Sequence, residues 1–416
     1  MCNLIRFVLL SLAVVSCQKA LFNNPPRSQS YSGRQSGQKD STVRQPTGPD
    51  APDRIPDVYA TAFCYPEGVD WQSDSTLDAR PELVLFKNGL EQLRVPVEGR
   101  ADAQRHRLSR GHLWTDSCDG REVVVSCDGK GRFRYAGDEL LRGFLEVNGI
   151  VYTLGQRQGR EGFSFRINGD EYFSASTGTI LGGPEDADWE GGAFSRDSAG
   201  VCYSYGIPLR KGDALLWEYH VMREKEEIKN LPAGSVSALY DIRVYEGILY
   251  RSELRSSIFP TYCLVKDDTY LTVEMAETEQ PHYCKLVPVN GRMCLKGYST
   301  GIPGSKTYAY WLRDPASVLF MAVDNQPILD LLTDGEHCAY LVASPEGSVR
   351  TVYLDKENIP FTSDRYSLPS SRCAQFKQGL LALALSNARE GEHLLICNRE
   401  VTPLKFNGYF TSVQIY

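Results

Sequence analysis

Short apolar runs separated by turn residues follow one another through most of the chain. Residues 83–86 (Leu-Val-Leu-Phe) and 239–245 are typical runs, and glycine, asparagine and aspartate stand between them. Apolar runs of this length, bounded by turn residues, are typical of β-strands joined in hairpins. The pattern therefore predicts an all-β protein built from antiparallel strands.

A glycine turn recurs with a fixed period. Gly247, Gly291, Gly335 and Gly379 lie 44 residues apart, and each stands between two strand-like runs. About 20 residues further along each unit comes a second turn, as at Asn168-Gly169. Two hairpins per period give four strands. With looser spacing the pattern extends back to Asp57, which makes eight units of about 45 residues.

Repeated four-stranded units of this length predict a β-propeller, because each small sheet buries its faces only against the next blade. The chain opens on an outgoing strand, residues 57–63, and ends on an incoming strand, residues 409–415. These two strands are predicted to pair in one blade and to close the ring without an exposed edge. Eight blades are expected; seven is the alternative if the short second unit, residues 111–148, is not a full blade.

The N-terminal residues have the pattern of an export signal. Arg6 precedes an apolar segment, residues 7–15, and Ser16 precedes Cys17. The run resembles a bacterial lipobox, which implies a lipoprotein signal peptide over residues 1–16 and a lipid on Cys17. An ordinary signal peptide cut after Ser16 is the alternative. Residues 17–54 are rich in Pro, Ser, Gln, Gly and Arg and predict a disordered tether, which leaves residues 55–416 for the propeller.

The repeats resemble those of a known group of proteins. The outgoing strand at residues 149–155, Gly-x-Val-Tyr-x-x-Gly, and the Asn-Gly hairpins at Asn88 and Asn168 are similar to repeats of β-propeller lipoproteins of Gram-negative bacteria. The resemblance covers the chain after the tether. Gln18, and not an aspartate, follows Cys17, which favours the outer membrane, on its periplasmic or cell-surface face.

Charge and cysteine content narrow the picture further. The net charge of −7 provides no basic field for phosphates, so nucleic acid is not an expected partner. Among twelve cysteines, Cys294 and Cys338 occupy one position in successive units, and facing sheets lie about 10 Å apart, too far for a disulfide. We therefore predict mostly reduced thiols, with Cys118 and Cys127 of one unit as the candidate exception.

Motifs of catalysis and metal binding are not recognisable. The six histidines show no zinc-ligand spacing, and no nucleophile elbow, phosphate loop or dinucleotide fingerprint occurs, so we expect no metal and no cofactor. Residues 185–190 place four carboxylates around Trp189, which could hold calcium, but we interpret them as a solvated acidic excursion. The alternative to a binding protein is a glycan-active hydrolase or lyase with a carboxylate pair at the propeller axis.

Charged residues recur on the strand that enters each glycine turn, which should be the innermost strand of its blade. These residues are Arg105, Arg107, Asp241, Arg243, Lys285 and Arg372. Near the axis they could form a cationic funnel for an anionic or sugar ligand; the alternative is that they merely occupy the wet mouth of a channel. We expect a lipid-anchored binding or scaffolding module, more an interaction protein than an enzyme, whose partner is an envelope protein or glycan.

Overall fold

The computed structural model describes residues 56–72, 80–97, 106–158, 161–183, 191–236, 238–255, 261–272, 281–300, 308–355, 357–362, 365–398 and 400–416. The predicted signal peptide, Cys17, the tether, Arg105 and the acidic residues 185–190 lie outside these ranges. No helix within the described part is long and apolar enough to cross a membrane.

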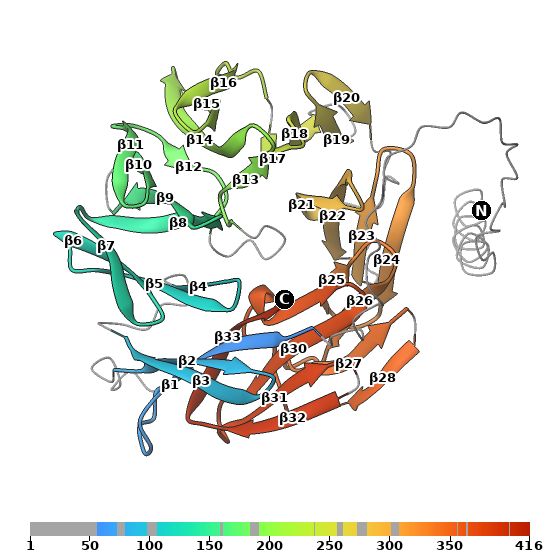
Figure 1. The fold of residues 1–416 in the computed structure, drawn as a ribbon. Coiled ribbons are helices and arrows are strands. Elements are labelled where there is room, and N and C mark those ends of the chain that lie inside the picture. Colours follow the sequence, from blue (N-terminus) through green and yellow to red (C-terminus); the bar gives the residue numbers. More distant parts are fainter. Residues whose placement is uncertain are drawn as a thin grey trace, which may run out of the picture. The chain divides into compact units, whose positions relative to one another are not determined.

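Eight antiparallel sheets surround a common centre as the blades of a β-propeller (Figure 1). Blade 1 consists of β1 (Val58–Cys64), β2 (Glu82–Lys87), β3 (Leu90–Pro96) and β33 (Gly408–Ile415). Blade 2 consists of β4 (His106–Ser109), β5 (His112–Cys118), β6 (Glu122–Cys127) and β7 (Lys130–Ala136). Blade 3 consists of β8 (Glu139–Val147), β9 (Ile150–Arg157), β10 (Phe163–Ile167) and β11 (Asp170–Ala175). Blade 4 consists of β12 (Thr179–Ile180), β13 (Ser195–Asp197), β14 (Gly200–Lys211), β15 (Ala214–Arg223) and β16 (Glu226–Leu231).

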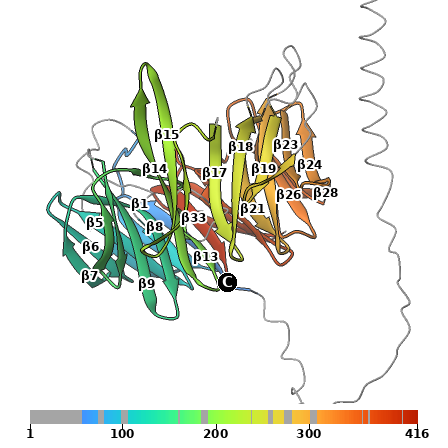
Figure 2. The same cartoon turned by 90° about the horizontal axis from the view of Figure 1, so that it is seen from above.

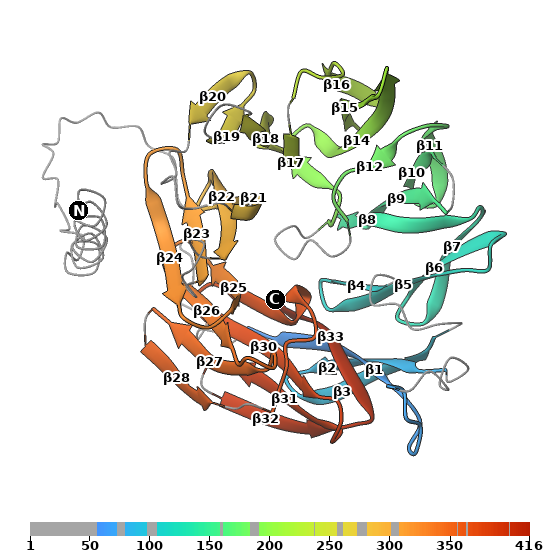
Figure 3. The ribbon, with the colours of Figure 1, turned by 180° about the vertical axis from the view of Figure 1, so that it is seen from behind.

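The second half of the ring repeats this plan (Figure 3). Blade 5 consists of β17 (Ala238–Tyr245), β18 (Ile248–Arg255), β19 (Thr261–Lys266) and β20 (Thr269–Thr272). Blade 6 consists of β21 (Pro281–Val289), β22 (Arg292–Thr300), β23 (Tyr308–Arg313) and β24 (Val318–Asp324). Blade 7 consists of β25 (Ile328–Thr333), β26 (Cys338–Ala343), β27 (Val349–Leu354) and β28 (Glu357–Thr362). Blade 8 follows the 3-10 turn η3 (Ser371–Cys373) and consists of β29 (Ala374–Lys377), β30 (Leu380–Asn387), β31 (Glu392–Cys397) and β32 (Glu400–Lys405).

The two ends of the described chain close the ring, as predicted. β1 pairs with β33 from Val58 opposite Ile415 to Cys64 opposite Gly408. Backbone hydrogen bonds join Asp57 and Tyr416 in both directions, at 3.1 and 3.0 Å. The seven-bladed alternative is wrong, because the short second unit forms a complete four-stranded sheet, β4 to β7. Blade 4 differs from the others by its divided inner strand, since β12 and β13 both pair with β14, and by the greater length of β14 and β15.

The core lies between the blades. The side chains of β30 alternate between its two faces. Leu381, Leu383 and Leu385 pack against blade 7, whereas Ala382 and Ala384 pack against blade 1. The side chains of Leu383, Ala382 and Ala384 are fully buried. A strand with apolar residues on both faces is therefore required in the middle of each blade, which explains the continuous apolar runs in the sequence.

A polar turn is repeated in six blades. Asn88, Asp128, Asn168, Asp267, Asp355 and Asn398 all adopt the left-handed backbone conformation, with φ between 47° and 52°. In each, the side-chain Oδ1 accepts the N–H of a residue near the start of the second strand, at 2.7 to 3.3 Å. Asparagine and aspartate tolerate this conformation and supply the hydrogen-bond acceptor, so one of them occupies this turn position in each of the six blades.

The ring has two faces. We call the face that carries the glycine turns, and also these polar turns, the turn face, and the other the open face. Asp57 and Tyr416 lie on the turn face. The β14–β15 hairpin points the other way and extends beyond β17 on the open face (Figure 2).

All ten cysteines within the described ranges are free thiols. The candidate exception, a disulfide between Cys118 and Cys127, is not formed: Cys118 lies opposite Val123 and Cys127 opposite Trp114, at the two ends of the β5–β6 pair. Burial raises the pKa of Cys284, Cys64 and Cys202 to about 12, so these thiols behave as small apolar groups.

Candidate functional site

A pocket of about 360 Å³ lies where blades 4, 5 and 6 meet. Its lining residues come from the end of β12, from β15, from the start of β17 and from β21: Leu181, Gly182, Trp217, Tyr219, Leu239, Tyr240, Asp241, Ile242 and Lys285. The first residues of β17 lie on the open face, and so does the turn of the β14–β15 hairpin. The pocket therefore belongs to that face, opposite the chain ends at Asp57 and Tyr416.

Two aromatic rings on β15 form one wall. Trp217 and Tyr219 are two residues apart, so both side chains point to the same side of the strand, and their rings lie 6.4 Å apart with planes only 10° from parallel. They cover Gly206 on the neighbouring strand β14. A Cβ atom there would lie 3.0 Å from Trp217 and 3.3 Å from Tyr219, so a larger residue at Gly206 would displace both rings.

Tyr240 provides the third ring. It lies at a β-bulge, because the pairing of β17 with β18 shifts register between Leu239 and Asp241. A bulge re-aims the side chain at the extra residue, and the Tyr240 side chain is 38% exposed. The pocket thus combines three aromatic rings with one carboxylate and one ammonium group, those of Asp241 and Lys285.

Asp241 is held in place by three N–H groups. Its Oδ1 accepts from the Ile242 backbone at 2.9 Å and from Arg243 Nε at 3.1 Å, and its Oδ2 accepts from the Leu286 backbone in blade 6 at 3.1 Å. Arg243 is only 3% exposed and also donates from Nη1 to the Gly192 carbonyl at 2.7 Å. Asp241 therefore joins blades 5 and 6, and Arg243 joins blade 5 to the segment before β13.

Arg107 approaches the same segment from blade 2. Its Nη2 lies 3.1 Å from the position that a Cβ on Gly192 would take. Gly192 forms a β-bridge with Gly143, so residues 191–194 lie along the inner strand of blade 3. Two of the predicted arginines, Arg107 and Arg243, thus converge on one glycine.

The predicted residues that the structure describes make contacts in three places. Asp241 and Lys285 line the pocket, Arg107 and Arg243 meet at Gly192, and Arg372, in η3, donates from Nη2 to the His106 carbonyl at 3.0 Å. Arg105 is outside the described residues. Ligand binding by these side chains stays a prediction.

The sequence patterns missed the aromatic residues of the pocket. Trp217, Tyr219 and Tyr240 are ordinary strand residues, and only the packing of three blades brings them together. One signal was available: an aromatic pair two residues apart follows the turn at Gly212 in strands of twelve and ten residues, longer than the other strands of the ring.

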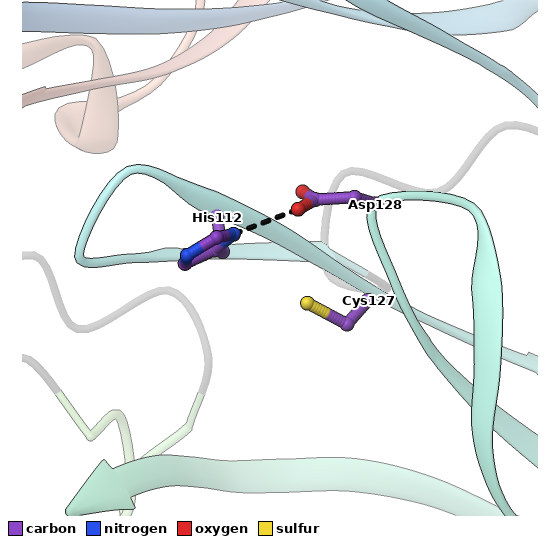
Figure 4. Close-up of side chains that lie close together, drawn as sticks. All are labelled: His112, Cys127 and Asp128. Atoms are coloured by element: carbon purple, nitrogen blue, oxygen red, sulfur yellow. Dashed lines mark hydrogen bonds and ion pairs between the residues drawn. The ribbon is translucent and has the colours of Figure 1, made fainter. Parts of the chain in front are cut away.

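A second missed group lies on the turn face of blade 2 (Figure 4). His112, Cys127 and Asp128 offer one nitrogen, one sulfur and one oxygen atom, all within 4.8 Å of one another. His112 Nδ1 lies 2.7 Å from Asp128 Oδ2. The histidine belongs to one turn of the blade and the other two residues to another, so no short spacing along the sequence marks the three as ligands.

No protein-family model matches the chain, and no curated protein matches it. Solved structures that match include BamB from Moraxella catarrhalis, at 10% identity over 74% of this chain and 90% of that one, with a TM-score of 0.40. The β-propeller domain of the Trilobed protease from Pyrococcus furiosus matches at 9% identity over 73% and 97%, with a TM-score of 0.44. Sqt1 from Chaetomium thermophilum matches at 12% identity over 83% and 91%, with a TM-score of 0.42. These likenesses concern the fold alone, and the assignment as an eight-bladed β-propeller rests on the sheet topology itself.

Proposed function

We propose that this protein is a lipid-anchored binding module of the bacterial envelope that holds a carbohydrate chain in the pocket between blades 4, 5 and 6. The observation that carries the proposal is the aromatic wall: Trp217 and Tyr219 present nearly parallel rings, and the exposed Tyr240 lines the same pocket.

The chemistry of a sugar matches this lining. A pyranose ring has an apolar C–H face, which stacks on the electron-rich face of an aromatic ring. Its hydroxyl or carboxylate groups need polar partners at the edge, and Lys285 supplies an ammonium group there. Most ligand pockets follow this plan of apolar walls with a few placed polar groups.

The pocket supports binding better than cleavage. Glycoside hydrolases use two carboxyl groups, about 5 to 10 Å apart. Asp241 is the only carboxylate among the described residues that line the pocket, and both of its oxygens accept N–H groups of the protein. We therefore favour a binding module over a hydrolase or lyase.

The position of the pocket fits an anchored protein. The described chain starts at the turn face, where Asp57 bonds to Tyr416. A chain attached to the outer membrane through Cys17 would enter the propeller there, which leaves the open face and its pocket accessible to a partner. A protein ligand docked on the β14–β15 hairpin, where Leu209 and Leu215 are exposed, is the competing outcome of the test.

The test is direct binding of envelope glycans. Soluble peptidoglycan fragments and lipopolysaccharide core oligosaccharides are titrated into the intact protein by calorimetry, together with Trp217→Ala and Tyr240→Ala. Each lost ring should weaken binding by up to about 1.5 kcal/mol, or about ten-fold in Kd. Tyr172→Ala, which removes an exposed ring from the outer strand of blade 3, is the matched control and should bind as the wild type does. Absence of binding to both glycan classes, or equal affinity of Trp217→Ala, would rule the proposal out.

A further inference from the structure

We infer that His112, Cys127 and Asp128 form a binding site for a borderline divalent transition metal, such as Zn²⁺ or Co²⁺, on the turn face of blade 2. The three side chains come from two turns of one blade (Figure 4). His112 begins β5, whereas Cys127 ends β6 and Asp128 follows it in the β6–β7 turn. The site is separate from the pocket, which belongs to the open face.

The spacing of the donor atoms suits tetrahedral coordination. Metal–ligand bonds of about 2.0 to 2.3 Å place neighbouring ligand atoms roughly 3.3 to 3.8 Å apart. The donor atoms lie within 4.8 Å of one another, and the closest pair, His112 Nδ1 and Asp128 Oδ2, is 2.7 Å apart. Small side-chain rotations are enough to open the close pair around an ion. The His112 side chain is 58% exposed, so the fourth position is open to water.

The turn orients Asp128 before any ion binds. Its backbone N–H donates to the Leu113 carbonyl at 2.8 Å, and its Oδ1 accepts the Leu113 N–H at 2.9 Å. With Oδ1 used in this way, Oδ2 points toward His112. A carboxylate fixed by such a partner coordinates at a smaller entropic cost than a free one.

Blade 7 contains the same turn without the thiol. His337 Nδ1 lies 2.6 Å from Asp355 Oδ2, and Asp355 Oδ1 accepts the Cys338 N–H at 3.0 Å. Leu354 occupies the position of Cys127. The histidine–aspartate pair alone therefore belongs to the architecture of the turn. Only blade 2 adds a third ligand atom to it among the described residues.

The donor set selects the class of metal. Nitrogen and sulfur ligands favour zinc and related ions, whereas calcium and magnesium prefer oxygen. The Cys127 thiol loses its proton when it binds a metal ion. Coordination forms the metal–sulfur bond and releases this proton to solvent, with no change in oxidation state.

Co²⁺ titration of the metal-free full chain tests the site, since a cobalt–thiolate bond gives a charge-transfer absorption band. We expect a band that saturates near one equivalent and that Zn²⁺ displaces. Cys127→Leu, which copies blade 7, should abolish the band. Asp128→Asn should weaken binding at least about ten-fold while it keeps the turn, because Asn88, Asn168 and Asn398 fill this position elsewhere in the ring. His337→Ala is the matched control and should behave as the wild type.

Thermal unfolding of each variant shows that it is folded before titration. A thiolate band that persists in Cys127→Leu would assign the metal to another cysteine and overturn the inference. So would the absence of a band in the wild type, or an unchanged affinity of folded Asp128→Asn.

Discussion

His393 illustrates, at the scale of one residue, how burial fixes an ionisation state. The side chain is fully buried on β31, its ring stacks on Phe406 with centroids 3.6 Å apart, and Nε2 donates to the Phe406 carbonyl at 2.9 Å. Burial lowers the pKa of His393 from 6.5 to about 4. The imidazole is therefore neutral in the folded protein at neutral pH.

This shift predicts a loss of stability in mild acid. Between about pH 6.5 and 4 the unfolded chain binds a proton at His393 and the folded protein does not, so protons favour unfolding. We expect the contribution of this residue to the free energy of unfolding to fall by about 3 kcal/mol over that range. Urea unfolding at a series of pH values measures it. Glutamine at position 393 keeps a donor but cannot titrate, so the acid loss should be smaller in that variant; an equal loss in both proteins would contradict the prediction.

At the scale of one element, the repeated polar turn predicts how a substitution at Asn398 changes stability. The equivalent turns of other blades show which residue is a suitable control. Asn398 adopts φ 52°, and its Oδ1 accepts the Leu381 N–H at 2.7 Å. Asn398→Ala removes that bond and places a residue without a compensating side chain in the left-handed region. We expect a loss of about 2 kcal/mol in the free energy of unfolding.

Aspartate is the matched control for this turn, because Asp128, Asp267 and Asp355 fill the same position in other blades. Asn398→Asp should therefore change the free energy of unfolding by less than about 0.5 kcal/mol. Guanidinium unfolding compares the three proteins. If alanine is tolerated as well as aspartate, the side-chain bond does not stabilise the turn.

The turns and the pocket differ in how far the sequence could predict them. Turn residues recur because the local backbone demands them, so the blades, their number and the closure by β1 and β33 could be predicted. The charged residues of the inner strands could be named from their distance to the glycine turn. Their partners could not, because the hydrogen bonds from Leu286 to Asp241 and from Arg243 to Gly192 join different blades. Trp217 and Tyr240 come to line one pocket only through the packing of blades 4 and 5, and no spacing along the chain indicates this.

At the scale of the whole molecule, both ends of the described chain lie on the turn face, where Asp57 and Tyr416 exchange backbone hydrogen bonds. Ring closure and the proposed membrane attachment depend on different residues. Closure depends on the pairing of β1 with β33, and attachment on the proposed lipid at Cys17. The two can be separated experimentally.

Cys17→Ser should release the protein from the membrane fraction and abolish its labelling by radioactive palmitate, while its thermal unfolding stays that of the wild type. Deletion of residues 408–416 should do the reverse: the chain stays labelled, but the exposed edge of β1 and the loss of Phe410 and Val413 from the core destroy cooperative unfolding. Fractionation, labelling and a thermal melt of both variants give the answer. Palmitate labelling that survives in Cys17→Ser would refute the anchor without affecting the propeller. A cooperative melt of the truncated chain would show that the pairing of β1 with β33 is not what holds the ring closed.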